Sequence, residues 1–290
     1  MRGSSGVFVS GALLLAVACG DDAGVPALPI AHLTSPAQAP DDGDSAAAPG
    51  PAASYRVAAV VETGTIVGRV RFRATRPGLL PFDVARQHDV CGQSQPNPVF
   101  AVGPAGGFAD VVVWLDVDEG ALPPPRTEPV IIEQVGCRYS PHISIAHPGE
   151  RILFRNADAV LHNVHAAWED GQTWLNFGQP RRGDASVQVA PRVGVLTLRC
   201  DAGHPWTLAW LHILPHPYHA ITDVEGAFRI ESVPAGTHRV RLWHSSWELL
   251  GTASGRPRFG DPATAEAEVT VTAGGEATLD LLLPVPGESP

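Results

Sequence analysis

Short runs of apolar residues, alternating or continuous, cover most of the chain after Tyr55, and turns containing Pro and Gly separate them. Runs of this length, rich in Val, Ile and Leu, predict β-strands, and no segment repeats its apolar residues with the period of a helix. The predicted strands span 65–72, 108–117, 128–135, 142–146, 151–156, 193–200, 207–214, 226–233, 237–244, 267–272 and 277–283. We therefore predict an all-β fold with two β-sandwiches or barrels in tandem.

The first 54 residues lack this strand pattern. An apolar run from Val7 to Val17 is too short to span a membrane as a helix and is typical of a signal peptide. It ends in LAVAC, which resembles a bacterial lipobox, so residues 1–19 are predicted to be a signal peptide with a lipidated Cys19; an ordinary cleaved signal is the alternative. Residues 20–54, rich in Ala, Pro and Asp, are predicted to be a disordered tether. We expect an exported protein, a periplasmic or cell-surface lipoprotein of a bacterium, held at the membrane through Cys19.

The composition of the 290-residue chain, with 44% hydrophobic residues, is that of a folded protein that buries a core. A formal net charge of -10 leaves no excess of positive charge to attract phosphates. The charge therefore argues against nucleic acid as a partner.

The four cysteines carry different predictions. Export favours disulfides, and with Cys19 assigned to the lipid, Cys91 and Cys137 are the natural pair, a pairing that the sequence alone does not prove. This disulfide would close a loop of about 45 residues and stabilise the fold by about 4 kcal/mol in the loop-entropy model. Cys200 is then left over, and a bound metal would hold its sulfur as a thiolate.

Two segments, 139–166 and 191–214, contain the candidate metal ligands. Both resemble the corresponding parts of a cupredoxin, the plastocyanin-like blue copper family, over about residues 131–214. The matching residues are Pro141, Gly149, Glu150, Phe154, Asn156, His162, Asn163, Cys200 and His204. The resemblance implies a Greek-key β-sandwich or barrel in which His162, Cys200 and His204 bind one type 1-like copper ion.

The residue pattern of 193–200 supports the same assignment. Strand alternation places Leu196, Leu198 and Cys200 on one face, which directs the thiol into the core. Two imidazoles and one thiolate form the trigonal donor set that is typical of copper in electron-transfer sites.

One ligand of the family is missing. Cupredoxins usually add a weak axial methionine after the second histidine, but the only methionine of this chain is Met1. Thr207 stands at the corresponding place, in a loop one residue longer than in similar sequences. Three alternatives stay open: a three-coordinate site, an axial oxygen from Thr207 or a backbone carbonyl, and a degenerate site without copper.

Other histidines have weaker claims to a metal. His165 is best interpreted as a residue at the rim of the site, with ligation or an indirect role as alternatives. His142 and His212 are predicted to be packed, structural histidines. His88 indicates a second metal site only weakly, because the predicted disulfide explains the nearby cysteine.

The chain after residue 217 has a different pattern. The stretch AITDVEGAFRIESVPAGTHRVRLWH, residues 220–244, resembles a carboxypeptidase-regulatory-like, transthyretin-type β-sandwich. We therefore predict a cupredoxin-like domain at 55–217, with extra N-terminal strands, and a second, smaller sandwich at 218–286. Some proteins of this combined shape are labelled methylamine utilisation-like, but no residue here indicates an amine substrate.

These patterns favour a copper-binding protein that transfers single electrons to and from a redox protein partner. The chain has no GxSxG, HExxH, glycine-rich phosphate loop or paired-carboxylate motif, so we expect a carrier or binding protein rather than an enzyme. The alternatives are a surface binding or structural module with a degenerate copper site, and a periplasmic copper carrier.

Overall fold

The computed structural model describes residues 55–72, 79–97, 99–103, 106–121, 123–124, 126–253 and 256–283. The predicted signal peptide, the tether, the lipidation site at Cys19 and residues 284–286 lie outside the described residues. Regular structure in the described ranges is almost entirely β, which confirms the all-β fold, and the α-helix found there is the single turn α1 (His88–Cys91). No helix in these ranges is long and apolar enough to cross a membrane.

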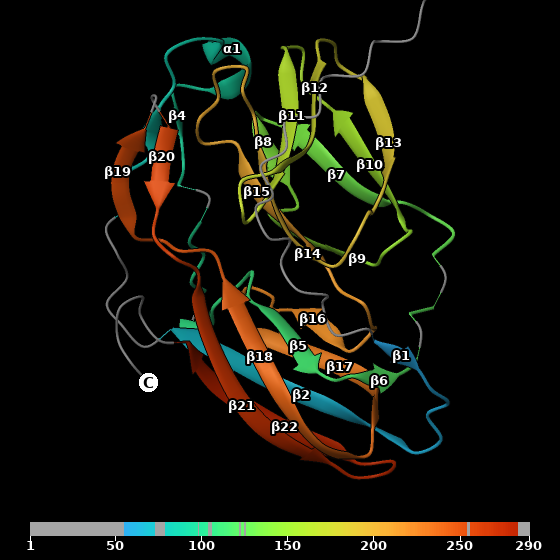
Figure 1. Ribbon diagram of the computed structural model, residues 1–290. Helices are drawn as coiled ribbons and strands as arrows, with labels where there is room; N and C mark the ends of the chain where they lie inside the picture. Colours follow the sequence, from blue (N-terminus) through green and yellow to red (C-terminus); the bar gives the residue numbers. More distant parts are fainter. Residues whose placement is uncertain are drawn as a thin grey trace, which may run out of the picture. The chain divides into compact units, whose positions relative to one another are not determined.

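One sandwich combines strands from both ends of the described chain, and we call it the split sandwich (Figure 1). Its four-stranded sheet has the order β16 (His219–Ile221), β5 (Val112–Asp116), β18 (Gly236–His244) and β21 (Ala263–Val271). Its three-stranded sheet has the order β17 (Ala227–Pro234), β2 (Thr63–Phe72) and β22 (Glu276–Leu283). Buried side chains from both sheets, such as Ile66 and Val240, share one core.

This pairing differs from the expected boundary at residue 217. Strand β2 lies between β17 and β22, and β5 lies between β16 and β18, so both join the sandwich that we had placed at 218–286. The close approach of β2 to the turn before β17 requires a glycine at position 226, because a Cβ there would clash with the carbonyl oxygen of Val70. Alternation shows which face of a strand is buried but not which distant strand it pairs with.

The second sandwich, which we call the ligand sandwich, contains the strands that resemble a cupredoxin (Figure 1). Its four-stranded sheet has the order β13 (Ala185–Val189), β10 (Arg151–Asn156), β7 (Val130–Val135) and β8 (Arg138–Ser140). Its five-stranded sheet has the order β12 (Thr173–Gln179), β11 (His162–Trp168), β14 (Gly194–Arg199), β15 (Leu208–Ile213) and β9 (Ile143–Ala146). Ile152 and Phe154 from one sheet and Leu196 and Leu198 from the other are completely buried in a common core.

Short strand pairs complete the fold. They are β1 (Arg56–Val57) with β6 (Glu119–Gly120), β3 (Phe82–Asp83) with β4 (Ser94–Gln95), and β19 (Leu249–Ala253) with β20 (Arg256–Phe259). The β3–β4 pair flanks α1 and so fixes the segment that contains Cys91.

Strand β15 is buried on both faces. Its residues Ala209 and Leu211 pack in the core of the ligand sandwich, whereas Trp210 belongs to the core of the split sandwich and contacts Trp243 with ring centroids 5.9 Å apart. Because the loop with the candidate ligands ends where β15 begins, the second core also fixes one end of that loop.

Candidate metal centre

The three predicted ligands lie at the ends of two paired strands. His162 is the first residue of β11, and Cys200 follows the last residue of β14. Strands β11 and β14 are antiparallel, with His165 opposite Arg199, so the start of one strand lies beside the end of the other. The turn after β14 returns His204 to the same place before β15 begins.

The donor atoms of these residues converge. The Cys200 Sγ lies 3.8 Å from the His162 Nδ1 and 3.5 Å from the His204 Nδ1. All three side chains are at least 98% buried, and their donor atoms lie within 4.8 Å of one another. Two donors that share one metal, with bonds of about 2.0 Å to nitrogen and about 2.3 Å to sulfur, are about 3.5–3.8 Å apart. The spacing and the donor types therefore fit a single soft metal ion.

The ring nitrogens on the far side of both imidazoles are held by polar side chains. The His162 Nε2 donates to the Asp158 carboxylate at 2.9 Å, and the His204 Nε2 donates to the Gln87 side-chain oxygen at 2.6 Å. Because a carboxylate or amide oxygen only accepts, each Nε2 carries the proton, and in the neutral ring Nδ1 has the lone pair. Both lone pairs then face the sulfur, as metal ligation requires.

Burial sets the protonation of the three donors. Loss of solvation lowers the pKa of His162 and lowers the pKa of His204 to about 4, which keeps both imidazoles neutral at pH 7. Burial also raises the pKa of the Cys200 thiol, while backbone N–H groups of Ala202 and Asn163 act in the opposite direction. Metal binding must therefore release the thiol proton.

A disulfide lies against the candidate site. Cys91 and Cys137 are bonded, as the sequence analysis predicts, and among the described cysteines Cys200 is the free one. The Cys91 Sγ is 3.8 Å from the His204 Nε2, so the bridge contacts one candidate ligand directly. On the other side, the backbone N–H groups of Gly136 and Cys137 both donate to the Asp158 carboxylate at 2.8 Å. The bridge thus contacts His204, and the backbone around Cys137 holds the carboxylate partner of His162.

Thr207 does not join the donor cluster. Its hydroxyl is buried and donates to the carbonyl oxygen of Cys137 at 2.5 Å, and the Trp206 ring nitrogen donates to the same oxygen at 2.9 Å. Trp206 is 3% exposed and packs with the disulfide, so its side chain belongs to a buried cluster rather than to an exposed rim. These contacts anchor the loop between Cys200 and β15.

The other histidines lie away from the donor cluster. His165 is at the surface between Asp201 and Thr173, with ring nitrogens 2.8 and 3.0 Å from their side-chain oxygens. His142 and His212 are packed: the first contacts Trp210 and the second contacts Trp243 through their rings. The His88 Nε2 lies 2.6 Å from the carbonyl oxygen of Val84 in its own segment.

Sequence reasoning missed Asp158 and Gln87. Asp158 stands four residues before His162, a spacing that indicates nothing in a loop between strands. Gln87 is more than a hundred residues from His204, and its left-handed backbone (φ 62°) at the start of α1 is visible only in the structure. Strained backbone of this kind in a residue other than glycine is concentrated at functional sites.

The sequence matches no protein-family model and no curated protein. It is similar to solved structures of copper proteins over about a third of its length. A purple cupredoxin from Nitrosopumilus maritimus is 24% identical, with a TM-score of 0.25, over 29% of this chain and 99% of that chain. Amicyanin from Paracoccus versutus is 14% identical, with a TM-score of 0.28, over 31% of this chain and 85% of that chain. A copper-containing nitrite reductase from Thermus scotoductus is 21% identical, with a TM-score of 0.26, over 35% of this chain and 25% of that chain. Any functional inference for this chain therefore rests on its own strands and side chains.

Proposed function

We propose that this chain is a copper-binding electron-transfer protein, with one copper ion bound by His162, Cys200 and His204. The observation that supports the proposal is the convergence of two imidazole Nδ1 atoms and one thiol sulfur in a buried place. Copper in such a donor set supplies a one-electron couple, Cu(I)/Cu(II). The chain contributes two imidazoles whose neutral form and orientation are already set, and a sulfur that binds as thiolate.

A role as a carrier rather than an enzyme agrees with the space around the donors. The hollow beside Cys200, lined also by Pro205 and Thr207, has a volume of about 40 Å³. That volume accommodates a few water molecules at most and no organic substrate. An electron needs no such room, because it passes between proteins whose surfaces only touch. The partner in this proposal is another redox protein.

The missing axial methionine leads to a three-donor proposal. Thr207 faces Cys137 through its hydroxyl hydrogen bond, and Met1 is the only methionine in the chain. We place no fourth ligand in the site. The proposal also includes export and a lipid anchor at Cys19, both of which rest on the N-terminal sequence.

The copper-carrier alternative is less well supported. His204 is 1% exposed, and its outer nitrogen is covered by Gln87. A metal held behind such contacts exchanges slowly with a recipient protein, whereas an electron crosses them without ligand exchange.

Copper titration of the full chain tests the proposal. We expect one copper per chain and an intense visible thiolate-to-copper band, which ascorbate bleaches and ferricyanide restores. Cys200→Ser should remove the band, and His238→Gln, which changes a histidine on β18, should retain it. A chain that binds no copper, or binds it without a band that depends on Cys200, would contradict electron transfer and favour a structural or binding module.

A further inference from the structure

Two histidines outside the candidate copper site face each other directly. His147 follows β9, and His219 begins β16, so the two residues come from the ligand sandwich and the split sandwich. Their Nε2 atoms are 3.4 Å apart, and their ring centroids are 5.1 Å apart. The sequence PHPYH at 215–219 contains the second of these residues and has no part in copper binding.

A backbone carbonyl orients the other nitrogen of the His147 ring. The His147 Nδ1 lies 2.8 Å from the carbonyl oxygen of Leu214. A carbonyl only accepts, so Nδ1 carries the proton, and the Nε2 of the neutral ring has a lone pair directed toward His219. Fixing one imidazole nitrogen by a backbone carbonyl is the usual way in which proteins orient a metal-binding histidine.

The distance between the two Nε2 atoms fits a shared metal better than a hydrogen bond. Hydrogen bonds donated by N–H groups are mostly about 2.7–3.2 Å long. Two imidazole nitrogens bound to one tetrahedral ion at about 2.0–2.1 Å are about 3.3–3.4 Å apart. The observed distance of 3.4 Å between the two Nε2 atoms equals the distance expected for a shared metal ion.

A third imidazole lies in the same loop. His216 is 3% exposed, and its Nδ1 has no hydrogen-bond partner among the residues that the structure describes. The His216 ring packs against Tyr55 and Tyr218, with ring centroids 5.5 and 5.6 Å away, so no contact among the described residues places it between His147 and His219.

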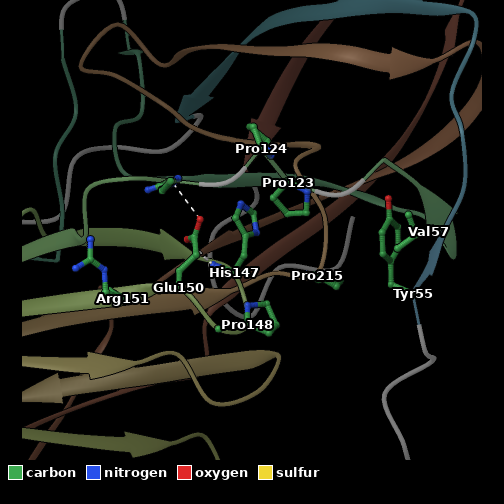
Figure 2. Close-up of a pocket in the computed structure, with 11 residues that line it drawn as sticks. Tyr55, Val57, Pro123, Pro124, His147, Pro148, Glu150, Arg151 and Pro215 are labelled. Carbon is green, nitrogen blue, oxygen red and sulfur yellow. Dashed lines mark hydrogen bonds and ion pairs between the residues drawn. The ribbon is translucent and has the colours of Figure 1, made fainter.

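Solvent reaches His147 through a pocket of about 650 Å³ (Figure 2). Figure 2 shows the His147 ring among the pocket-lining side chains, near Glu150 and Pro123. Arg126 also lines the pocket, and its guanidinium is 3.3 Å from the Glu150 carboxylate, which balances its charge. A small cation that enters the pocket passes this ion pair and the Arg151 guanidinium, which also lines the pocket.

We propose that His147 and His219 bind a divalent transition-metal cation of the kind that imidazole prefers, such as Zn²⁺. The ion joins the turn after β9 to the first residue of β16, and so links the ligand sandwich to the split sandwich. It is a structural site, separate from the three donors around Cys200, and it does not depend on copper binding there.

Zinc binding by the full chain carrying Cys200→Ala tests this site, because that background lacks the thiolate of the copper site. We expect equilibrium dialysis followed by elemental analysis to find bound zinc, and His219→Gln to lower the stoichiometry by one per chain. His204→Gln, made in the same background, reports zinc held by the copper-site histidines, and His238→Gln should change nothing. Zinc should also raise the melting temperature of the parent and not that of the His219→Gln chain.

His219 is the better first substitution because it is only partly buried, whereas His147 is buried and its loss could unfold the turn. A measurement without any substitution guards against that problem: crystals of the unaltered chain grown with Zn²⁺ should give an anomalous difference peak between the two Nε2 atoms. No peak there, or a zinc stoichiometry that His219→Gln leaves unchanged, overturns the proposal and leaves a hydrogen bond between two histidines.

Discussion

At the scale of single residues, Asp158 has the largest influence on the candidate site without being a donor in it. Asp158 is 5% exposed, and its carboxylate accepts three hydrogen bonds, from the His162 ring and from the backbone N–H groups of Gly136 and Cys137. It thereby orients one candidate ligand and fixes the disulfide loop above it. Loss of its charge should affect the metal more than the fold, because an amide of the same shape still accepts some of these bonds.

We predict that Asp158→Asn lowers copper affinity by about 10–100-fold, the usual effect of losing a hydrogen-bond partner of a metal-binding histidine. A competition titration against a chelator measures the change. Asp118→Asn alters an exposed carboxylate and serves as the control. Equal affinities in the Asp158 variant and the parent would show that the carboxylate has only a structural role.

Thr207 gives a second prediction at this scale. Thr207→Val keeps the shape and removes the hydroxyl that donates to the Cys137 carbonyl, which still accepts from Trp206. We expect a loss of about 1 kcal/mol in the free energy of unfolding, the usual net value of one hydrogen bond. The visible copper spectrum should not change. A shifted thiolate-to-copper band would instead identify the hydroxyl as a copper ligand.

At the scale of elements, the segment from α1 to the disulfide covers the outer side of His204. Cys91 lies at the end of α1, Gln87 lies just before it, and both contact the His204 ring. The bridge joins this segment to Cys137, 46 residues further along the chain. Neither α1 nor Gln87 belongs to the strands that contain the ligands, so the disulfide and the β3–β4 pair position them.

We predict that replacing both Cys91 and Cys137 by Ser destabilises the fold by about 4 kcal/mol, the loop-entropy value for a loop of this size. Copper affinity should also fall, since Gln87 is then less firmly held against His204. Urea denaturation and the chelator competition measure the two effects. Full copper affinity in a destabilised double variant would separate the disulfide from the metal site.

The strands that contain the ligands could be predicted from sequence, and their distant partners could not. Alternation in 193–200 predicts that Cys200 points inward, like Leu198 two residues before it. In the structure both residues are buried, and the Cys200 Sγ lies 3.8 Å from the His162 Nδ1. Strands β12 and β13 were missed, since their partly exposed residues give a weak apolar pattern. The place of β2 between β17 and β22 depends on pairing with residues far along the chain, such as Arg69 with Ala227 and Thr65 with Glu276, and a local pattern does not report such pairing.

At the scale of the whole molecule, several histidines are buried in or between the two sandwiches. Burial lowers the pKa of His142 to about 4 and the pKa values of His212 and His244 to about 3. All three rings contact aromatic side chains of the cores. In the unfolded chain a histidine has a pKa of about 6.5, so acid favours unfolding.

The sign and range of this effect give the last prediction. Above about pH 6.5 both states carry neutral rings, and these histidines contribute no pH dependence. Below about pH 6.5 the unfolded chain binds protons at these histidines and the folded chain does not. Stability is therefore lost as the pH falls from about 6.5 toward the folded-state pKa values of about 4 for His142 and about 3 for His212 and His244. Each such histidine steepens the loss by up to about 1.4 kcal/mol per pH unit. We expect urea denaturation of the metal-free protein between pH 7 and pH 5 to show a reduced slope for His212→Leu. Since the buried His212 Nε2 has no hydrogen-bond partner among the described residues, the leucine should cost little stability at pH 7. An unchanged slope in His212→Leu would mean that His212 is protonated equally in both states, and so that water reaches it between the two cores.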